Sequence, residues 1–259
     1  MGCAKMKKFA KLCATILVLF AVLTASALAA EVLYSGTCGG EGDGSNLTWT
    51  LDDEGTLRIE GKGRMDYYSS YYNNLAPWNN SSSLIKSIVI DKGVTSIGSE
   101  AFYYCSNLTT VTIPSSVTSI EWAAFRDCQS LRFVYITDLA AWCKITFGDL
   151  EANPLSCGAD LYINGKQATN ITIPSSVTSI SNYAFNGCSS LASVTIPKGV
   201  KNIGVSAFFW CGSLVSVTFP TSMTSIGDSA FHGCSSLTSV IIPKGVTSIG
   251  WSAFEGCSS

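Results

Sequence analysis

Three consecutive stretches of the chain read LASVTIPKGVKNIGVSAFFWCGS (residues 191–213), LVSVTFPTSMTSIGDSAFHGCSS (residues 214–236) and LTSVIIPKGVTSIGWSAFEGCSS (residues 237–259). The same 23-residue pattern fits residues 85–107, 108–130 and 168–190, and residues 131–167 are a variant stretched to 37 residues. One copy is too short to enclose a core, so each copy buries its apolar face against its neighbours. The sequence therefore predicts a solenoid of seven copies.

The order of residues within a copy predicts its path. In residues 108–130, Leu108, Val111 and Ile113 have the spacing of a short parallel strand whose alternate side chains enter the core. Pro114 has no N–H group to donate, so it ends the strand. The Ala-Phe-x-x-Cys segment of residues 124–128 has the spacing of one helical turn. We therefore expect each copy to form a strand, a turn, an extended return and a short helix.

This pattern resembles the BspA-like leucine-rich repeats, the type typified by Treponema pallidum repeat proteins, whose phrase is close to IPxxVTSIGxxAFxxCxxLxxV. The resemblance covers roughly residues 85–259 and is most literal at residues 113–134, 173–194, 196–217 and 219–240. It implies an α/β repeat solenoid, a right-handed horseshoe or arc with short parallel strands and short helices. Members of the family are secreted or surface-attached, and many are adhesins or surface antigens that bind host proteins or other cells. The resemblance implies no catalytic chemistry.

The N-terminal residues indicate where the protein acts. Four lysines lie before or at the start of an apolar run at residues 12–23, and Ala27-Leu28-Ala29 provides the small residues of a cleavage site. This pattern predicts a secretory signal peptide over residues 1–29. A membrane anchor is the alternative, but the run is short for a span. No second hydrophobic span follows, so we expect no membrane span in the mature chain and a secreted or bacterial cell-surface location.

Residues 30–84 differ in composition from the copies. Asn46–Leu51 and Thr56–Glu60 alternate apolar and polar residues, and Asp52–Gly55 joins them as a hairpin turn. We expect this small N-terminal β-hairpin to cap the first copy, since a solenoid needs a polar cover over its apolar end. The Tyr-, Asn- and Ser-rich stretch Asp66–Ser83 is either a binding loop or a loop packed on the cap.

The last copy finishes at Ser259, on the repeat boundary. No further residues follow in this sequence to cover the core face that another copy would occupy. We expect either a fragment or shortened gene product, or an exposed edge with a tendency to stack on another molecule.

Composition favours an extracellular binding protein over an enzyme or a nucleic-acid-binding protein. The formal net charge is −2 and 13% of the residues are charged, so no basic face is available to neutralise phosphates. His232 is the only histidine, and other copies carry Tyr, Arg, Asn, Phe or Glu at its position. No Cys-His, Ser-His-Asp or metal-ligand spacing occurs. We therefore expect no enzymatic activity, no cofactor and no nucleic-acid partner.

Eleven cysteines in a secreted chain raise the question of disulfides. Six occupy the same position in successive copies: Cys105, Cys128, Cys188, Cys211, Cys234 and Cys257. Stacked strands place equivalent Cβ atoms about 4.8 Å apart, roughly 1 Å more than a disulfide prefers. We therefore expect a buried row of thiols, with metal binding by this row as a weaker alternative. Cys38, Cys143 and Cys157 lie outside the predicted row, and one pair among them is a candidate disulfide.

The solvent side of the parallel strands is the usual binding surface of a solenoid. It carries the candidate ligand-binding residues Thr110, Thr112, Phe133, Tyr135, Asn170 and Thr172. Strand propensity alone explains the threonines, whereas Phe133 and Tyr135 break the pattern in the copy that carries the extra length. We hypothesise a binding patch formed by these two aromatic residues and the insertion. The alternative is that the two rings pack beneath the insertion.

The insertion contains two local signals. Asp138 is a candidate N-cap for a helix at residues 139–143. Asn164-Gly165 is typical of a two-residue hairpin turn.

A second row of aromatic residues lies around the predicted short helices and includes Trp122, Trp210 and Trp251. Exposed rings can stack on sugars, although packing between adjacent helices explains part of the row. Two functions therefore remain. The first is adhesion, in which a secreted or surface protein binds an extracellular matrix or cell-surface protein of a host or neighbouring cell. The second is a glycan-binding module or a purely structural surface spacer. Sugar binding should depend on the tryptophans, and protein binding on Phe133 and Tyr135.

Overall fold

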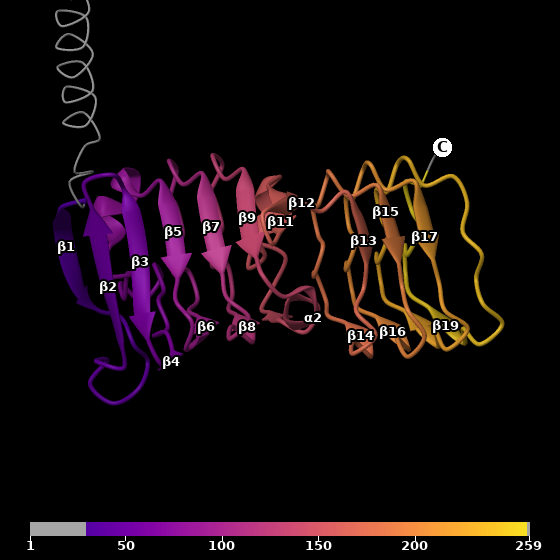
Figure 1. The fold of residues 1–259 in the computed structure, drawn as a ribbon, viewed down its shortest axis with the longest axis horizontal. Helices are drawn as coiled ribbons and strands as arrows, with labels where there is room; N and C mark the ends of the chain where they lie inside the picture. Colours follow the sequence, from indigo (N-terminus) through magenta and orange to yellow (C-terminus); the bar gives the residue numbers. More distant parts are fainter. Residues whose placement is uncertain (1–29, 258–259) are drawn as a thin grey trace, which may run out of the picture. The chain divides into compact units, whose positions relative to one another are not determined.

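The computed structural model describes residues 30–257. The signal peptide predicted for residues 1–29 lies outside these residues. The chain divides into two units between Glu31 and Val32, and every described strand and helix lies in the second unit. Within that unit the strands follow one another side by side (Figure 1). They do so because repeated copies place the same strand at the same point of successive turns.

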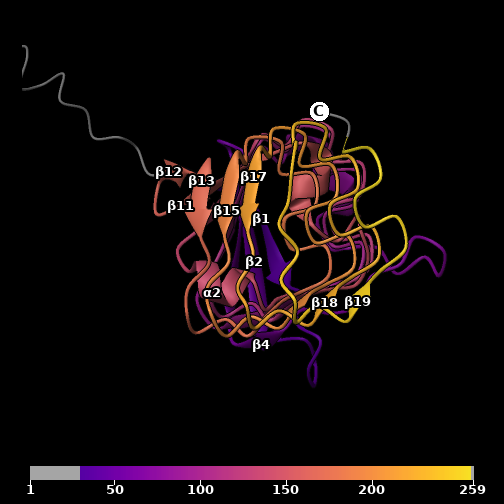
Figure 2. The same ribbon diagram turned by 90° about the vertical axis from the view of Figure 1, so that its right-hand side faces the viewer.

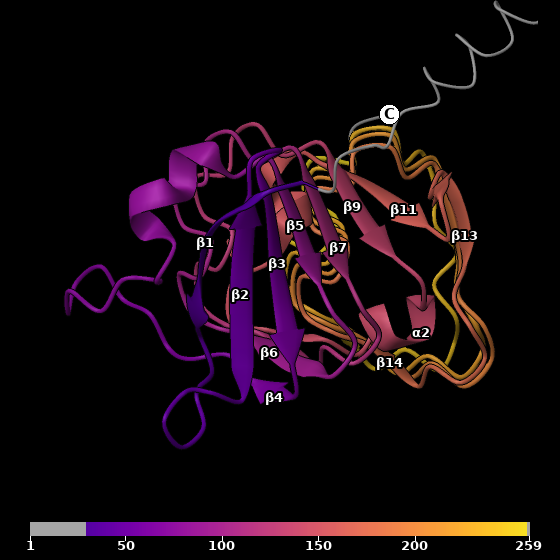
Figure 3. The same ribbon diagram turned by 60° about the vertical axis from the view of Figure 1, so that its left-hand side comes forward.

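A mostly parallel sheet of eight strands forms one side of the first part of the coil. Its order is β1 (Val32–Thr37), β2 (Leu47–Asp52), β3 (Thr56–Gly61), β5 (Ser87–Ile90), β7 (Thr110–Ile113), β9 (Phe133–Ile136), β11 (Asp160–Ile163) and β12 (Lys166–Gln167). Figure 3 shows β2, β3, β5, β7 and β9 next to one another. Ser87 pairs with Thr110 and Thr110 with Phe133, which confirms the predicted parallel strands in these copies.

A second parallel sheet follows, with β13 (Asn170–Thr172), β15 (Ser193–Thr195) and β17 (Ser216–Thr218). These strands stand in line in Figure 2. The pattern also predicts a strand at residues 239–241, and this prediction is wrong: β17 is the edge of the sheet. Ile241 and Ile242 are exposed, so this segment lacks the apolar burial that holds the other strands in place.

The extended return of each copy forms two further sheets on another side of the coil (Figures 1 and 2). One contains β4 (Gly63–Arg64), β6 (Val94–Ile97), β8 (Ser119–Ile120) and β10 (Thr146–Phe147). The other contains β14 (Ser179–Ile180), β16 (Asn202–Ile203), β18 (Ser225–Ile226) and β19 (Ser248–Ile249). The isoleucine of most of these strands is buried, so each copy closes its core from two sides.

The short helix predicted at each Ala-Phe-x-x-Cys segment is wrong for the regular copies, which form turns there. The residue before the alanine has φ between +48° and +62° in all six regular copies, for example Glu100 and Ser229. A second left-handed residue follows four positions later, as at Trp210 and Gly233. An α-helix needs φ near −63° throughout, so two left-handed residues prevent it. The turns are held between copies instead, by bonds such as Phe208 N–H to the Ala230 carbonyl at 2.8 Å.

Helices among the described residues are short: η1 (Asn79–Leu84), α2 (Leu139–Trp142) and η2 (Pro154–Cys157). The predicted N-cap is confirmed, because the Asp138 side chain accepts bonds from the N–H groups of Ala140 and Ala141 at 2.8 and 3.0 Å. This cap satisfies two donors that a four-residue helix leaves unpaired.

The N-terminal strands form an antiparallel hairpin, with Leu51 opposite Leu57 in β2 and β3. Asp52 Oδ1 accepts a bond from Thr56 N–H at 2.7 Å and fixes the turn. β3 then pairs in parallel with β5, the first repeat strand. The hairpin therefore continues the same sheet, while its capping role and the horseshoe curvature stay predictions.

The stretched copy at residues 131–167 contains three strands of the eight-stranded sheet, β9, β11 and β12, which corrects its interpretation as one enlarged turn. β11 pairs in parallel with β9, and Asp160 stands beside Phe133, 27 residues earlier. Asn164 and Gly165 then have φ of +50° and +76° and return the chain into β12, antiparallel to β11. This confirms the predicted hairpin turn, because a two-residue turn of this hand needs positive φ at both positions.

The strand ladder is interrupted between β12 and β13, and buried side chains join its two parts. Trp142 Nε1 donates to the Ala184 carbonyl at 2.8 Å. Asn153 Nδ2 donates to the carbonyls of Tyr183 and Ala184 at 2.6 and 3.2 Å. In regular copies that follow another regular copy, the carbonyl of the equivalent alanine accepts a bond from the phenylalanine N–H group of the preceding copy, as Ala230 does from Phe208. The insertion thus replaces backbone donors with side-chain donors.

Candidate functional site

The outward face of the eight-stranded sheet takes its side chains from alternate strand residues. Val111 and Val134 point into the core and are buried, whereas their neighbours Thr110 and Phe133 point outward. Thr110 stands beside Phe133 and Thr112 beside Tyr135. The structure therefore brings these four predicted residues together on adjacent strands.

Tyr162 on β11 completes an aromatic cluster that sequence reasoning missed. Its ring centroid lies 5.8 Å from that of Phe133 and 5.2 Å from that of Tyr135, and those two centroids are 6.4 Å apart. The signal was present in the sequence, because Asp160-Leu161-Tyr162-Ile163 repeats the alternation of Phe133-Val134-Tyr135-Ile136. We call Phe133, Tyr135 and Tyr162 the aromatic cluster.

The insertion lies beside the two predicted aromatic residues rather than over them. Its strand β11 extends the sheet in register, and its turn leads away through β12. Phe133 keeps 36% of its surface exposed, and Tyr135 and Tyr162 are half-buried. The three rings therefore present contact area to solvent and also support one another.

Polar groups border the aromatic cluster. Asp160 stands beside Phe133 and accepts a bond from Gln167 Nε2 at 2.8 Å. On the other side, Thr110 and Thr112 of β7 stand beside Phe133 and Tyr135. An aromatic centre with a polar border is the composition of many protein-binding patches.

Asn170 and Thr172 lie on β13, in the second sheet, and both are exposed. Asn170 Oδ1 accepts a bond from Ser193 Oγ at 2.6 Å, so part of its polar surface is already used. β11 and β12 come between β9 and β13 along the chain. The structure therefore places these two residues outside the aromatic cluster.

The three candidate tryptophans lie on the turns and do not form one site. All are exposed, but Trp122 and Trp251 precede the first left-handed residue of their turns and Trp210 is the second left-handed residue of its own. Trp210 leans over Gly233 of the next copy. No ring contact joins the three tryptophans within residues 30–257.

His232 packs against an aromatic side chain of the preceding copy. Its ring stacks on Phe209 at 4.9 Å, and Nδ1 lies 3.6 Å from Glu255 Oε2 at the surface. Within residues 30–257, no group of three His, Cys, Asp or Glu side chains is arranged to hold a metal ion. The same part of the chain has no helix with the length and apolar character needed to cross a membrane.

The cysteine row is larger than the sequence suggested. Cys211 donates its thiol to the Phe185 carbonyl and Cys128 to the Phe102 carbonyl, both at 3.1 Å. Cys157 makes the same bond to Phe125 at 3.3 Å, so its prediction as a residue outside the row is wrong. The insertion lengthens this copy, so Cys157 does not follow Cys128 at the regular spacing of 23 residues. Burial raises the pKa of Cys188 to about 12 and that of Cys157 to about 11, which keeps both thiols protonated.

The comparison with solved structures matches bacterial proteins. The T. pallidum leucine-rich repeat protein shares 22% identity over 84% of this chain and 89% of its own, with a TM-score of 0.37. A leucine-rich cell surface protein of Faecalibacterium prausnitzii shares 22% identity over 84% and 86%, with a TM-score of 0.38. The pneumococcal vaccine antigen PcpA shares 17% over 83% and 78%, with a TM-score of 0.41.

The comparison with curated proteins finds no match. The model of the BspA type leucine-rich repeat region matches in six copies, at residues 78–147 and 156–259. These ranges contain every regular copy of the sequence pattern and most of the insertion. They also confirm the resemblance drawn from the repeated phrase. Since the match covers well over half of its length, the chain belongs to the BspA type leucine-rich repeat family.

Proposed function

We propose that this chain is a secreted or bacterial cell-surface adhesion protein that binds an extracellular protein ligand through the outward face of the eight-stranded sheet. Leucine-rich repeat proteins are typically non-enzymatic scaffolds that bind proteins. The observation that carries the proposal is the aromatic cluster, three partly exposed rings on two adjacent strands. The ligand class is a matrix or cell-surface protein.

Aromatic residues suit this role for a physical reason. Tyrosine and phenylalanine offer large contact areas with two side-chain torsions, so binding immobilises little rotamer freedom. In this protein the rings already contact one another and stand on hydrogen-bonded strands. A partner therefore meets a surface that is ordered before binding. Thr110 and Thr112 beside the cluster add hydroxyl groups for its polar border.

The rest of the chain supports this surface. We propose that residues 30–84 act as an N-terminal cap and that residues 85–259 are the repeat domain. The β2–β3 hairpin supports the cap, because it occupies the edge of the first repeat strand. The pattern at residues 1–29 supports export and a secreted or surface location.

The test is a binding screen of residues 30–259 against extracellular matrix proteins and polysaccharides on one array. We expect saturable binding to a protein, weakened at least about tenfold in Phe133→Ser/Tyr135→Ser, because central aromatic residues dominate interface energies. Tyr162→Ser should weaken binding of the same ligand. The matched control is Ser216→Ala/Thr218→Ala, which changes the same positions of a copy on β17 and should leave binding unchanged.

Circular dichroism and thermal unfolding would establish that each variant keeps its fold. Protein binding that survives in the double variant would contradict the proposed surface. Absence of binding to every protein would contradict adhesion and favour the spacer. Binding of polysaccharides alone, lost in tryptophan variants, would favour the glycan-binding alternative.

A further inference from the structure

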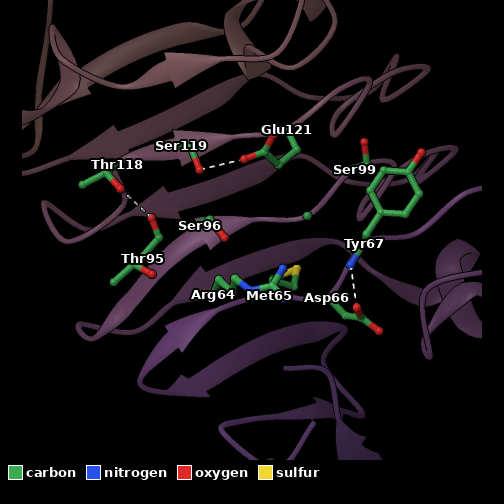
Figure 4. A pocket seen from close by; sticks show the side chains of 11 residues that line it. Arg64, Met65, Asp66, Tyr67, Thr95, Ser96, Ser99, Thr118, Ser119 and Glu121 are labelled. Atoms are coloured by element: carbon green, nitrogen blue, oxygen red, sulfur yellow. Dashed lines mark hydrogen bonds between the residues drawn. The ribbon is translucent and has the colours of Figure 1, made fainter. Parts of the chain in front are cut away.

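A polar groove of about 400 Å³ lies over β4, β6 and β8, away from the strands that carry the aromatic cluster. Figure 4 shows Tyr67 and Ser99 at one end of this groove and Thr95 and Thr118 at the other. Asp66 lies next to Tyr67 at the first end, and Glu121 lies on the opposite side of the groove, beside Ser119. The groove therefore combines one aromatic ring, two carboxylates and a series of hydroxyl groups.

The two carboxylates retain acceptor capacity. Glu121 Oε1 accepts a bond from Ser119 Oγ at 2.8 Å, and Asp66 Oδ1 accepts one from Tyr67 N–H at 2.8 Å. These bonds fix each side chain through one oxygen. No hydrogen bond from residues 30–257 reaches the second oxygen of either group. A carboxylate oxygen held in place with free lone pairs is ready to accept hydroxyl donors.

Tyr67 is held at the end of the groove by the loop that carries it. Its side chain is 52% exposed, whereas the adjacent Tyr68 is buried and donates its hydroxyl to the Cys38 carbonyl at 3.2 Å. The Tyr67 carbonyl accepts a bond from Asn74 Nδ2 at 2.6 Å. Ser70 N–H is bound by Glu100 at 2.7 Å. The Tyr67 ring is therefore presented to solvent by an ordered backbone.

The lining disfavours several ligand classes. β6 and β8 pair with a strand on both sides, and β4 is the edge of this sheet. On the outer side of β4, the Arg64 carbonyl accepts a bond from Gly40 N–H and Arg64 N–H donates to Glu41, both at 3.0 Å, so this edge is not free for an added peptide strand. Arg64 is outnumbered by Asp66 and Glu121, so the groove does not favour an anionic ligand. Met65 is buried and provides no apolar pocket for a side chain. A neutral ligand rich in hydroxyl groups satisfies the remaining chemistry.

We propose that this groove binds a neutral polysaccharide chain. One sugar ring lies with its C–H face on the Tyr67 ring, and neighbouring hydroxyl groups donate to the free oxygens of Asp66 and Glu121. The Ser96 hydroxyl lines the path of the chain, whereas Ser99 is buried and donates its hydroxyl to the Trp122 carbonyl at 3.2 Å. This site lies on other strands than the aromatic cluster, so it can be tested independently of the protein-binding proposal.

The experiment is calorimetric titration of residues 30–259 with cellohexaose, xylohexaose, mannohexaose and chitohexaose. We expect saturable binding of at least one of them with a Kd below about 1 mM. Tyr67→Ala and Glu121→Gln should each weaken it at least about fivefold, because each removes one ligand contact. Tyr67→Phe keeps the ring face and should stay within about twofold of the parent chain.

The matched control is Tyr71→Ala/Tyr72→Ala. Both tyrosines are on the same loop, are 86% and 72% exposed and do not line the groove, so their loss should leave affinity unchanged. Thermal unfolding would verify the fold of each variant. No binding of any of the four oligosaccharides would overturn the proposal. Affinity that is unchanged in Tyr67→Ala would also overturn the proposal, as would affinity that is lost in Phe133→Ser/Tyr135→Ser instead.

Discussion

The two halves of the coil stack their core rings differently. In the second block (residues 168–257), the rings of Phe185, Phe208, Phe231 and Phe254 follow one another at 5.1, 5.1 and 5.4 Å, with interplanar angles of 8°, 3° and 3°. In the first block (residues 47–167), Phe102 and Phe125 are 5.2 Å apart but tilted by 39°. Nearly identical copies reproduce one geometry by translation, whereas divergent copies adjust it locally.

A buried tryptophan precedes the first regular copy of each block. Trp78 Nε1 donates to the Ala101 carbonyl at 2.8 Å, and Trp142 Nε1 donates to the equivalent Ala184 carbonyl at the same distance. Asn153 also reaches Ala184, at 3.2 Å. The first turn of a ladder has no preceding regular copy to supply a backbone donor, so a side chain provides it. The difference is that the first regular copy of the second block receives two such side-chain donors, whereas the first regular copy of the first block receives one.

The largest expected effect is on the pH dependence of the free energy of unfolding, and it comes from the row of buried thiols that both blocks contain. Burial raises the pKa of Cys105, Cys188 and Cys234 from 9.0 to about 12. The unfolded chain releases these protons from about pH 9, while the folded chain keeps them. The free energy of unfolding is therefore unaffected well below pH 9 and decreases above it, by about 1.4 kcal/mol per pH unit for each thiol.

Urea unfolding under reducing conditions at increasing pH would measure this slope. In Cys188→Ala/Cys234→Ala, the slope above pH 9 should be smaller by about 3 kcal/mol per pH unit. Hydrogen exchange would show whether the two blocks lose stability together. An equal slope in the variant and the parent chain would contradict the role of the thiols.

The next effect concerns the tryptophan donors. Trp78→Phe leaves the buried Ala101 carbonyl without its indole donor, whereas after Trp142→Phe the Ala184 carbonyl keeps the Asn153 amide. Both changes remove similar volume, so we expect Trp78→Phe to destabilise the protein more, by about 1–2 kcal/mol. Chemical denaturation of both variants checks this. A third variant, Trp142→Phe/Asn153→Ala, removes both donors to the Ala184 carbonyl, so it should be destabilised at least as much as Trp78→Phe. Equal free energies of unfolding for Trp78→Phe and Trp142→Phe would contradict this prediction.

The smallest effect concerns the ring stack. Phe208 has parallel ring neighbours on both sides, and Phe125 has one tilted neighbour. Both side chains are fully buried. We therefore expect Phe208→Leu to cost about 0.5–1.5 kcal/mol more than Phe125→Leu, since aromatic pairs add about this much beyond burial. The measurement is the difference in the free energy of unfolding, and equal values would show that ring geometry adds nothing.

The sequence predicted the repeated strands and returns because burial imposes a fixed spacing on their apolar residues. It did not predict the turns at the Ala-Phe segments, because Glu100 and Ser229 give no propensity signal for positive φ. Their conformation is held by hydrogen bonds to the next copy, which are not local. Local signals were sufficient at Asp138 and at Asn164-Gly165, where the side chain or the turn residue itself determines the structure.

The candidate binding surface also contains residues that the sequence predicted and residues that it missed. Phe133 and Tyr135 were predicted because they break a periodic pattern on one strand. Tyr162 was missed because the insertion changes the strand spacing from 23 to 27 residues, and Cys157 because it follows Cys128 by 29 residues instead of 23. The repeated apolar spacing by itself determined the family, the parallel strands and the outward face. Tertiary structure decided which rings meet, which thiols join the row and where a groove opens, because those contacts depend on register between copies rather than on order within one.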